Sequence, residues 1–520
     1  MTEYTIPAGA AVGVLGAGTM GAGIAEVAAR AGHPVTVVDA AAGAAERAVA
    51  EVGRRLAHDV ERGRLSGQEA DAVTARLTPG LSVEDLAGCR VVVEAVVERL
   101  EVKRDLFAAL ERLVDPAAVL ATNTSSLSVT AIAAGLDHPE RVVGLHFFNP
   151  AQRMRLVEVV RGDACAPAVV EAVAELARAW GKTPVVCTST PGFIVNRVAR
   201  PYYGEAQRMV EEGVADPATV DAVLREAGGF PMGPFELTDL VGQDVNLAVS
   251  RSVWEQTFGD PRYAPTVFQQ RLVDAGRLGR KTGHGVFRYA DGKAVDAEPA
   301  TAPRRSAPAV LERVVHGEDR GFSVMEPFLA RAAAAGVAFE VVDESDDEIS
   351  VDPGIRLPGG AMLLEQQGES ATTTWGEGGA VVLLDWAHDP ATCTRVALSP
   401  SPDTPQESLD AAIGLCQAAG AAVSVVGDSP GGVVARTVAM LVNEAVELVA
   451  RGEASAEDVD VAMLLGTGYP SGPLEWGDRL GQLTVATIIE RLHDAFPTGR
   501  YRAGLALTRS VRAGVNLRDL

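Results

Sequence analysis

The sequence predicts an α/β domain built on a doubly wound parallel sheet, then an all-α domain, a smaller α/β domain and a second all-α domain. Three observations favour this order. Residues 1–187 alternate short β-branched runs with alanine-rich stretches, residues 191–276 read as helices, and motifs of that helical region recur 239 residues later. A chain of 520 residues has room for several domains at about 150 residues each.

The strands expected in the first domain are short apolar runs separated by longer helical patterns. They are Val12–Leu15, Val35–Val38, Arg90–Val97, Val119–Ala121, Val142–Leu145, Val157–Val160 and Pro184–Cys187. From Pro191 the pattern changes to helix. The charged residues Glu205, Arg208, Glu211 and Glu212 are expected to form a polar helix face there.

Residues 291–308 (DGKAVDAEPATAPRRSAP) predict a linker, because they contain three prolines and few apolar residues. After the linker, Phe339–Val342, Val381–Leu384 and Ala422–Val426 are predicted to be buried parallel strands of a second α/β unit. The acidic run 343–352 (DESDDEISVD) is expected to be a solvated turn.

An internal repeat relates the two helical regions. Residues 190–197 (TPGFIVNR) match residues 429–436 (SPGGVVAR) at an offset of 239, and the same offset aligns Glu205 with Glu444. With one residue of slip, Arg262-Tyr263 also aligns with Arg500-Tyr501. The domain boundaries that we expect are 1–188, 189–290, a linker at 291–308, 309–427 and 428–520.

Composition narrows the class of partner. With 46 basic and 69 acidic residues the net charge is −23, which disfavours nucleic acid and anionic membranes as partners. The five cysteines form no Cys-x-x-Cys pair, so we expect reduced thiols, no metal site and a cytoplasmic protein. The uncharged stretch Ile6–Ala25 contains six glycines, which argues against a membrane span.

Residues 16–21 (GAGTMG) read G-x-G-x-x-G between an apolar strand and an alanine-rich helix. This context predicts a Rossmann dinucleotide site with the pyrophosphate at the helix N-terminus. Gly16 would permit the tight turn, Gly18 the close approach of the backbone to the pyrophosphate, and Gly21 the close packing of the helix. Asp39 follows 18 residues after Gly21 and is placed to accept from the ribose hydroxyls. Since no arginine occurs between Asp39 and Arg47, NAD is favoured over NADP; an ordinary glycine turn is the alternative.

Polar residues also occur where the predicted strands end. His146 precedes an aromatic pair, and Glu158 lies in the apolar run 156–160 (LVEVV). An unpaired buried carboxylate is costly, so Glu158 needs a partner, and a carboxylate on one ring nitrogen would prepare His146 as a general base. A purely structural strand histidine is the alternative. The other seven histidines are expected in turns or on helices.

The sequence resembles the L-3-hydroxyacyl-CoA dehydrogenase family, in particular its longer bacterial members. The resemblance rests on seven motifs within residues 12–288: GAGTMGAGIA, VVVEAVVERLEVK, ATNTSSLSV, GLHFFNPAQRMRLVEVV, STPGFIVNRVARPYYGEA, GPFELTDLVG and GRKTGHGVF. It implies NAD-dependent oxidation of an (S)-3-hydroxyacyl-CoA to the 3-ketoacyl-CoA, or the reverse, of the 3-hydroxybutyryl-CoA or 3-hydroxyadipyl-CoA type. It also implies that a reduced Rossmann-like unit occupies residues 309–427.

The resemblance assigns roles to individual residues. It implies that His146 is the general base and Glu158 its partner, and that Ser125 and Asn196 bind the substrate near its reacting oxygen. The positions that it implies for contact with NAD are Gly16, Gly18, Thr19, Met20, Gly21, Asp39, Glu98, Lys103, Ser125, Asn149 and Lys281.

The CoA nucleotide carries phosphates, and a basic cluster on the helix after Asp39 could receive them. The cluster consists of Arg54, Arg55, Arg62 and Arg64. A solvated helix face is an equally good interpretation.

The second half departs from the motifs of the first. Ala435 stands where the first repeat has Asn196, and the second α/β unit has no G-x-G-x-x-G, HFFNP or NTSS. We therefore expect one active site per chain. The second repeat could supply a contact that shorter members make by dimerising, and a homodimer is left open. The alternative functions are oxidation of a small hydroxy acid without CoA and NAD binding without catalysis.

Overall fold

The computed structural model describes residues 4–316, 319, 321–344, 352–374 and 379–520. The chain divides into two units: unit 1 comprises Met1–Arg197 and Arg451–Thr467, and unit 2 comprises Val198–Ala450 and Gly468–Leu520. Unit 1 therefore combines the first predicted α/β domain with a segment of the second helical repeat.

Eight strands form one sheet among the described residues of unit 1, in the order β3-β2-β1-β4-β5-β6-β7-β8. They are β1 (Val12–Leu15), β2 (Val35–Val38), β3 (Leu77–Pro79), β4 (Val91–Glu94), β5 (Val119–Thr122), β6 (Val142–Phe147), β7 (Leu156–Arg161) and β8 (Thr183–Thr188). Every predicted strand is present, although the run Arg90–Val97 is a strand only at Val91–Glu94. Two features differ from the prediction: β3 was not expected, and β6 and β7 pair antiparallel in an otherwise parallel sheet.

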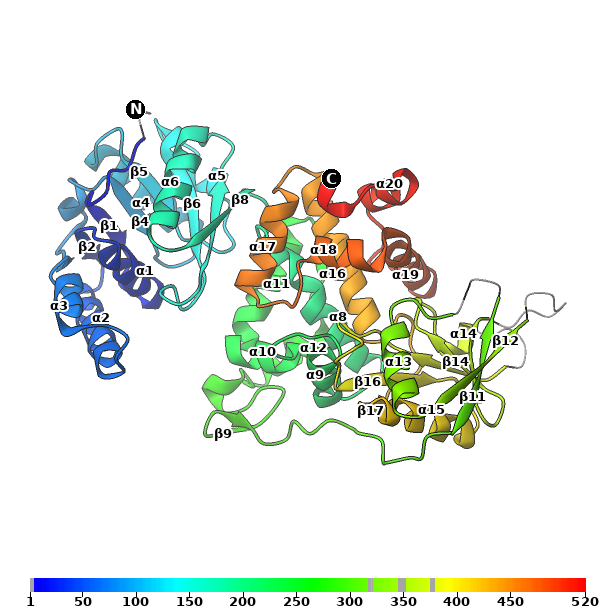
Figure 1. Cartoon of the computed structure of the whole chain (residues 1–520). Helices are drawn as coiled ribbons and strands as arrows, with labels where there is room; N and C mark the ends of the chain where they lie inside the picture. The colour runs from blue at the N-terminus through cyan, green and yellow to red at the C-terminus, as the bar shows by residue number, and fades with distance from the viewer. Residues whose placement is uncertain (1–3, 317–318, 320, 345–351, 375–378) are drawn as a thin grey trace. The chain divides into compact units, whose positions relative to one another are not determined.

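The helices of unit 1 follow the alanine-rich stretches of the sequence. They are α1 (Thr19–Arg30), α2 (Ala44–Glu61), α3 (Gly67–Thr74), α4 (Leu100–Leu113), α5 (Val129–Ala133), α6 (Pro167–Ala179), α7 (Val195–Val198, reaching the unit boundary) and α17 (Ala456–Gly466), with 3-10 turns η1 (Val83–Leu86) and η2 (Pro139–Arg141) (Figure 1). The sheet and helices up to α6 form the dinucleotide-type α/β domain that the sequence predicts.

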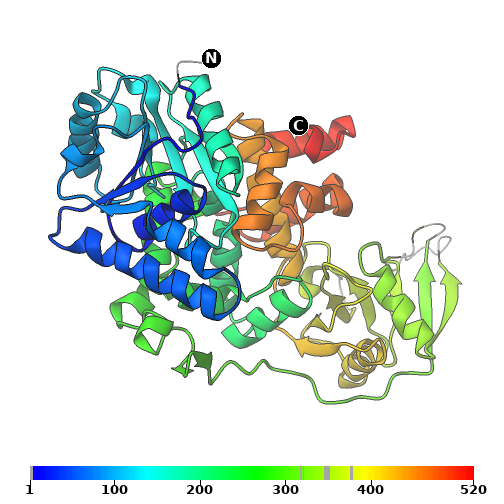
Figure 2. The same cartoon turned by 60° about the vertical axis from the view of Figure 1, so that its left-hand side comes forward.

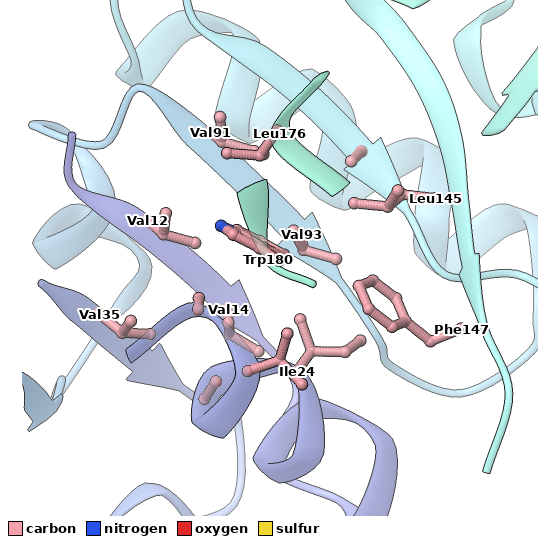
Figure 3. Close-up of a cluster of buried hydrophobic side chains, with 14 of the residues drawn as sticks. Val12, Val14, Ile24, Val35, Val91, Val93, Leu145, Phe147, Leu176 and Trp180 are labelled. Carbon is pink, nitrogen blue, oxygen red and sulfur yellow. The ribbon is translucent and has the colours of Figure 1, made fainter. Parts of the chain in front are cut away.

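The core of unit 1 explains why the β-branched runs become strands. Alternate residues of β1, β2, β4 and β6 point to one face, where they meet Ile24 of α1 and Leu176 of α6 (Figure 3). Phe147 at the end of β6 and Trp180 after α6 join the same cluster with their rings stacked 6.2 Å apart. This packing fixes the end of β6, from which the candidate catalytic histidine projects.

Unit 2 contains both helical repeats apart from α17 and the start of the first repeat, which ends in α7. Its helices are α8 (Arg200–Glu211), α9 (Pro217–Glu226), α10 (Pro234–Val241), α11 (Gln243–Gln256), α12 (Val267–Asp274), α13 (Glu326–Ala334), α14 (Ala371–Thr374), α15 (Gln406–Ala418), α16 (Val434–Ala450), α18 (Pro473–Leu480), α19 (Gln482–Ala495) and α20 (Leu505–Ala513), with 3-10 turns η3 (Pro261–Tyr263), η4 (Arg280–Thr282) and η5 (Leu517–Asp519). A two-stranded hairpin of β9 (Tyr289–Ala290) and β10 (Lys293–Ala294) spans the start of the predicted linker. The chain from 297 to 308 then runs without helix or strand (Figure 2).

The second α/β unit has a larger and more mixed sheet than the sequence suggested. Its order is β12-β11-β13-β14-β15-β16-β17 in the part of the chain that the structure describes. The strands are β11 (Val310–Val315), β12 (Ala338–Asp343), β13 (Gly354–Arg356), β14 (Met362–Glu365), β15 (Val381–Leu384), β16 (Arg395–Pro400) and β17 (Ala422–Val425). The prediction of three buried parallel strands was wrong on two points. The strand at Phe339–Val342 is a largely exposed edge strand, and β13 and β15 have antiparallel neighbours.

Residues 345–351 of the predicted acidic turn lie outside the described residues. The overall architecture of a Rossmann-type sheet, helical domains and a reduced second sheet is confirmed. In the described residues no helix has the length and apolar character needed to cross a bilayer.

The prediction of a polar helix face on α8 was wrong for Glu205. Its side chain is fully buried, and it accepts from the Arg500 Nε (2.7 Å), the Arg436 Nε (2.8 Å) and the Tyr501 hydroxyl (2.7 Å). The equivalent Glu444 of the second repeat binds Arg262 and Tyr263 of the first. Each repeat therefore inserts its buried glutamate into the Arg-Tyr pair of the other.

Candidate active site

The glycine loop after β1 is shaped by two close approaches. Gly16 has φ +112°, and a Cβ atom there would lie 2.4 Å from the Ala95 carbonyl oxygen. A Cβ on Gly21 would lie 1.8 Å from the carbonyl oxygen of Gly16, so the first turn of α1 can pack on the loop only if this residue is glycine.

Helix α1 begins with its first amide groups available to a ligand. Its N-cap is Gly18, which has no side chain to bind them, and open space surrounds the position where a Cβ would stand. Gly18 and Thr19 are exposed and Met20 is half-buried. A helix N-terminus of this kind fits a phosphate group, because its N–H groups and dipole favour an anion.

Asp39 lies directly after β2, beside the glycine loop. Its Oδ2 accepts from the Ala17 backbone N–H at 2.7 Å, and its Oδ1 accepts from the Ala41 N–H at 2.8 Å. The carboxylate thus holds the loop and remains half-buried at the sheet edge, in the position expected of a ribose-binding acid.

The two candidate catalytic residues are opposite each other across β6 and β7. His146 pairs with Glu158 in the antiparallel register, and the His146 Nδ1 lies 2.6 Å from the Glu158 Oε2. Glu158 is fully buried, and its Oε1 accepts from the backbone N–H groups of Ile194 (3.1 Å) and Val195 (2.9 Å) at the start of α7. Both carboxylate oxygens are therefore engaged.

The imidazole of His146 is held in one orientation. Its ring lies 4.6 Å from that of Phe148 and 5.9 Å from that of Phe193, measured between centroids. With Nδ1 donating to Glu158, the tautomer that is stabilised presents Nε2 as the proton acceptor. This arrangement can remove a proton from a bound hydroxyl group and stabilise the imidazolium that results.

The loop after β5 carries Ser125 and is organised by Glu98. The Glu98 carboxylate accepts from the Thr124 hydroxyl (2.7 Å) and from the backbone N–H groups of Ser125 (2.9 Å) and Ser126 (3.1 Å). Burial alone would raise the pKa of Glu98, but the Lys103 charge and these donors outweigh it and hold the pKa below its usual range. The Asn196 Nδ2 lies 3.4 Å from the Ser125 carbonyl oxygen, so the structure brings both predicted substrate contacts together.

Lys103 has a setting that the sequence did not reveal. Its side chain is 1% exposed, and its Nζ lies 2.6 Å from Glu94 and 3.3 Å from Glu98. The Thr122 hydroxyl donates to the same Glu94 carboxylate at 2.7 Å. Lys103 is therefore placed to hold Glu98 and the strand ends, and a direct contact with a cofactor stays a prediction.

A residue that sequence reasoning missed lies beside Asn196. The Glu453 carboxylate, just before α17, binds the guanidinium of Arg197 and accepts from the Thr190 hydroxyl at 3.0 Å. The Glu453 carbonyl oxygen also accepts from the Thr188 N–H at 2.8 Å, which extends β8. No local motif marks Glu453, because its partners lie more than 250 residues earlier in the chain.

The remaining predicted residues occupy separate places. Asn149 is exposed in the turn after β6. Arg54 pairs with Glu51 at 2.5 Å, Arg55 pairs with the buried Glu26 at 2.9 Å, and Arg62 follows the end of α2. Since Arg55 binds a buried carboxylate whereas the pair of Arg54 with Glu51 is exposed, Arg54 and Arg62 are the better candidates for a phosphate. In unit 2, Lys281 pairs with Asp244 at 2.5 Å.

The offset of 239 also locates the counterparts of the candidate catalytic pair in unit 2. His146 corresponds to Asp385, and Glu158 corresponds to Ala397. Asp385 accepts from the backbone N–H groups of Val433 and Val434, both at 2.8 Å, as Glu158 does from Ile194 and Val195. In the second half one aspartate thus binds the start of the helix from the histidine position, and the acid–base pair is absent from these two positions.

Family models match most of the chain, with a gap at residues 290–364. The model of the 3-hydroxyacyl-CoA dehydrogenase NAD binding domain matches residues 11–190, and that of the C-terminal domain of the same family matches twice, at 192–289 and 431–518. The model of the 3-hydroxybutyryl-CoA dehydrogenase reduced Rossmann-fold domain matches residues 365–430. These models therefore describe the repeat and the part of the second α/β unit from residue 365 onward.

Two sequences and one solved structure illustrate the similarity. The chain is 45% identical to the 3-hydroxyadipyl-CoA dehydrogenase of Escherichia coli K12 over 94% of this chain and 95% of that protein. It is 40% identical to a probable 3-hydroxybutyryl-CoA dehydrogenase of Deinococcus radiodurans over 53% of this chain and 99% of that protein. The crystal structure of 3-hydroxybutyryl-CoA dehydrogenase from Escherichia coli K12 superposes with a TM-score of 0.85 at 42% identity, covering 97% of this chain and 98% of the other.

Proposed function

This chain belongs to the 3-hydroxyacyl-CoA dehydrogenase family, and we propose that it oxidises an (S)-3-hydroxyacyl-CoA to the 3-ketoacyl-CoA with NAD, or catalyses the reverse reaction. The observation that carries the proposal is the buried pair of His146 and Glu158, 2.6 Å apart at the end of β6. A substrate of the 3-hydroxyadipyl-CoA or 3-hydroxybutyryl-CoA type follows from the names of the relatives.

The residues of unit 1 fit NAD. The uncapped start of α1 would hold the pyrophosphate, and Asp39 would accept from the adenosine ribose hydroxyls. The negative charge of Asp39 disfavours a 2′-phosphate, which is why we propose NAD and not NADP. When bound, NAD supplies the acceptor for the hydride that leaves C3 of the substrate.

His146 performs the proton transfer in this proposal. Its Nε2 takes the proton of the 3-hydroxyl group, while Glu158 binds the Nδ1 proton and stabilises the positive ring. In the reductive direction the same nitrogen returns the proton to the carbonyl oxygen. Ser125 and Asn196, which the Glu98 loop and α7 hold together, would bind the reacting oxygen.

For the CoA nucleotide we propose Arg54 and Arg62, near the end of α2. Replacing both with Gln should raise KM for acyl-CoA and leave KM for NAD unchanged, because the glycine loop does not depend on them. An unchanged KM for acyl-CoA would identify these arginines as a solvated helix face.

We also propose that the internal repeat replaces, within one chain, a contact made by dimerisation in half-length relatives. Support comes from reciprocal contacts between the two repeats. Glu453 of the second repeat binds Arg197 and Thr190 of the first, within unit 1. Glu212 of the first repeat binds Arg436 and Ser429 of the second, within unit 2. A fragment of residues 1–290 that stayed monomeric in solution would count against this proposal. The buried, unpaired cysteines fit a reducing compartment, and we place the enzyme in the cytoplasm.

The function is tested by following NADH oxidation with acetoacetyl-CoA, 3-oxoadipyl-CoA and free acetoacetate. We expect turnover of the thioesters and not of the free acid. His146→Gln should lower kcat by about 10²–10⁴, the usual contribution of a general base, with NAD binding retained. Turnover of free acetoacetate would favour a CoA-independent hydroxy acid dehydrogenase, and stoichiometric NADH binding without turnover would favour a non-catalytic protein.

A further inference from the structure

Unit 2 contains a cavity of about 480 Å³ that the proposed reaction does not use. Its walls come from Ser323 and Val324 before α13, from residues 387–390 after β15, and from Arg479 and Leu480 at the end of α18. This volume is within the range of about 300–1,000 Å³ that is typical of small-molecule pockets.

The cavity is built from the counterparts of first-half segments. By the offset of 239, residues 387–390 correspond to 148–151 of the HFFNP loop, and Arg479 and Leu480 correspond to Leu240 and Val241. Ser323 and Val324 precede α13 as the glycine loop precedes α1. The second half therefore keeps a cavity beside the counterparts of the glycine loop and the HFFNP loop, which serve the proposed active site in the first half.

The cavity is not equipped to bind a second dinucleotide. The amide groups at the start of α13 are already used by the buried Glu365, whose carboxylate accepts from the N–H groups of Ser323 (3.0 Å), Val324 (3.2 Å) and Met325 (2.9 Å). An internal carboxylate thus occupies the place where a pyrophosphate would bind a Rossmann helix. Asp385 and Ala397 stand where the catalytic pair would be.

The cavity is lined by one guanidinium group, that of Arg479. The Arg479 Nη2 donates to the His388 Nδ1 at 2.9 Å, and its guanidinium lies 5.8 Å from the Trp476 ring centroid. Within the described part of the chain, Arg479 makes no ion pair with a carboxylate. Arg479 is the cation that replaces the apolar Leu240 of the first half.

The neighbours of Arg479 are held in place by other contacts, and the carboxylates nearest to its partner His388 are those of Asp389 and Glu475. The His388 ring packs edge-on against Trp476 at 4.8 Å, and its Nδ1 accepts from Arg479, which has only donors, so this nitrogen carries no proton. Burial together with the Arg479 charge lowers the pKa of His388. The Asp389 carboxylate is bound within its own turn, by the Ala391 N–H (3.1 Å) and the Thr392 hydroxyl (2.6 Å). A guanidinium whose hydrogen-bond partner is a neutral ring has N–H groups left for an oxyanion.

We propose that this cavity is a second, non-catalytic site that binds a small organic anion through Arg479. The anionic group, a carboxylate or a phosphate, would lie on the guanidinium beside His388. The apolar walls at Ala387, Pro390 and Leu480 would contact the body of the molecule.

The test uses the full chain with acetate, adipate and inorganic phosphate as probes. Binding is measured by calorimetry and by the shift of the His388 ring signals in NMR, assigned with His388→Gln. We expect saturable binding with Kd of about 1 mM, typical of one charged contact with a small ligand. Tighter binding of adipate than of phosphate would identify an organic carboxylate, and the reverse order would identify a phosphate group.

Arg479→Gln should weaken binding at least about tenfold, as loss of a charge-assisted bond predicts, and Arg479→Lys should give an intermediate effect. Arg509→Gln removes the same charge from an exposed position on α20 and should leave binding unchanged. Absence of saturable binding, or equal affinity of Arg479→Gln and the parent chain, would overturn the proposal. So would loss of probe binding in the presence of saturating NAD, since the anion would then lie in the dinucleotide site.

Discussion

Replacing Glu158 with Gln separates the two roles of this residue. In the parent chain one carboxylate oxygen faces the His146 Nδ1, and the other accepts from the N–H groups of Ile194 and Val195. An amide has one accepting oxygen and one donating nitrogen. If the oxygen keeps the two backbone bonds, the nitrogen must donate to Nδ1, which moves the His146 proton to Nε2, the wrong nitrogen for catalysis.

The magnitude follows from this change of tautomer. A triad histidine with an asparagine in place of its aspartate loses about 10⁴ in kcat, and we expect Glu158→Gln to lose about 10³–10⁴. Stability should change little, because both backbone bonds are retained. Glu158→Ala should lose similar activity, and it should also lower the free energy of unfolding by about 2–5 kcal/mol, since it leaves two buried N–H groups without an acceptor.

The assay is NADH oxidation with acetoacetyl-CoA, combined with urea unfolding of each variant. Asp385→Asn is the matched control, because Asp385 binds the equivalent N–H groups of Val433 and Val434 in unit 2. It should lower stability, because an amide nitrogen cannot accept from the Trp386 and Ala435 N–H groups that now bind Oδ1. It should leave kcat/KM within about twofold of the parent value, because Asp385 orients no histidine. If Glu158→Gln kept more than about a tenth of the parent kcat, the tautomer argument would be wrong.

Three further changes test other parts of the structure. Asp39→Ala removes both the ribose acceptor and the loop bond to Ala17, so the ratio of kcat/KM for NAD to that for NADP should fall by at least about tenfold. The surrounding arginines outweigh the burial of Glu205 and lower its pKa from 4.5 to about 2. The Glu205 carboxylate therefore contributes about 3 kcal/mol to the free energy of unfolding above pH 4.5, and this contribution is lost as the pH falls toward 2. Denaturant titrations at several pH values should show this loss in the parent chain and not in Glu205→Gln. Glu453→Gln removes the negative charge that pairs with the buried Arg197 guanidinium, so it should lower the unfolding free energy by about 3 kcal/mol and raise KM for acyl-CoA; an unchanged KM would show that Glu453 acts on stability alone.

The strands of the first sheet could be predicted because both faces of that sheet are covered. Buried parallel strands are continuous apolar runs, and Val12–Leu15 and Val35–Val38 have the predicted bounds. The strands of the second sheet were harder to predict, because they are less completely buried. Its strand β11 alternates exposed and buried residues and contains Glu312 and Arg313, which pair with Arg356 and Glu326, so no apolar run marks it.

The pairing of His146 with Glu158 could be predicted from local constraints. A carboxylate in a strand of apolar residues needs a partner, and few polar residues were near enough in the pattern. The burial of Lys103 and the contact of Glu453 with Arg197 could not be predicted from the sequence, because both depend on which distant segments pack together. Sequence patterns report the environment of a residue more directly than the identity of its neighbour.

The two halves of the chain show how a site is lost while the fold remains. The start of the helix after each PG motif needs a buried acceptor, and either Glu158 from β7 or Asp385 after β15 can provide one. Once Asp385 takes that role, the carboxylate that orients the histidine is no longer needed, and Ala397 can stand in its place. Restoring histidine and glutamate at these two positions would still not produce a dehydrogenase, because Glu365 would keep the amide groups that a pyrophosphate requires.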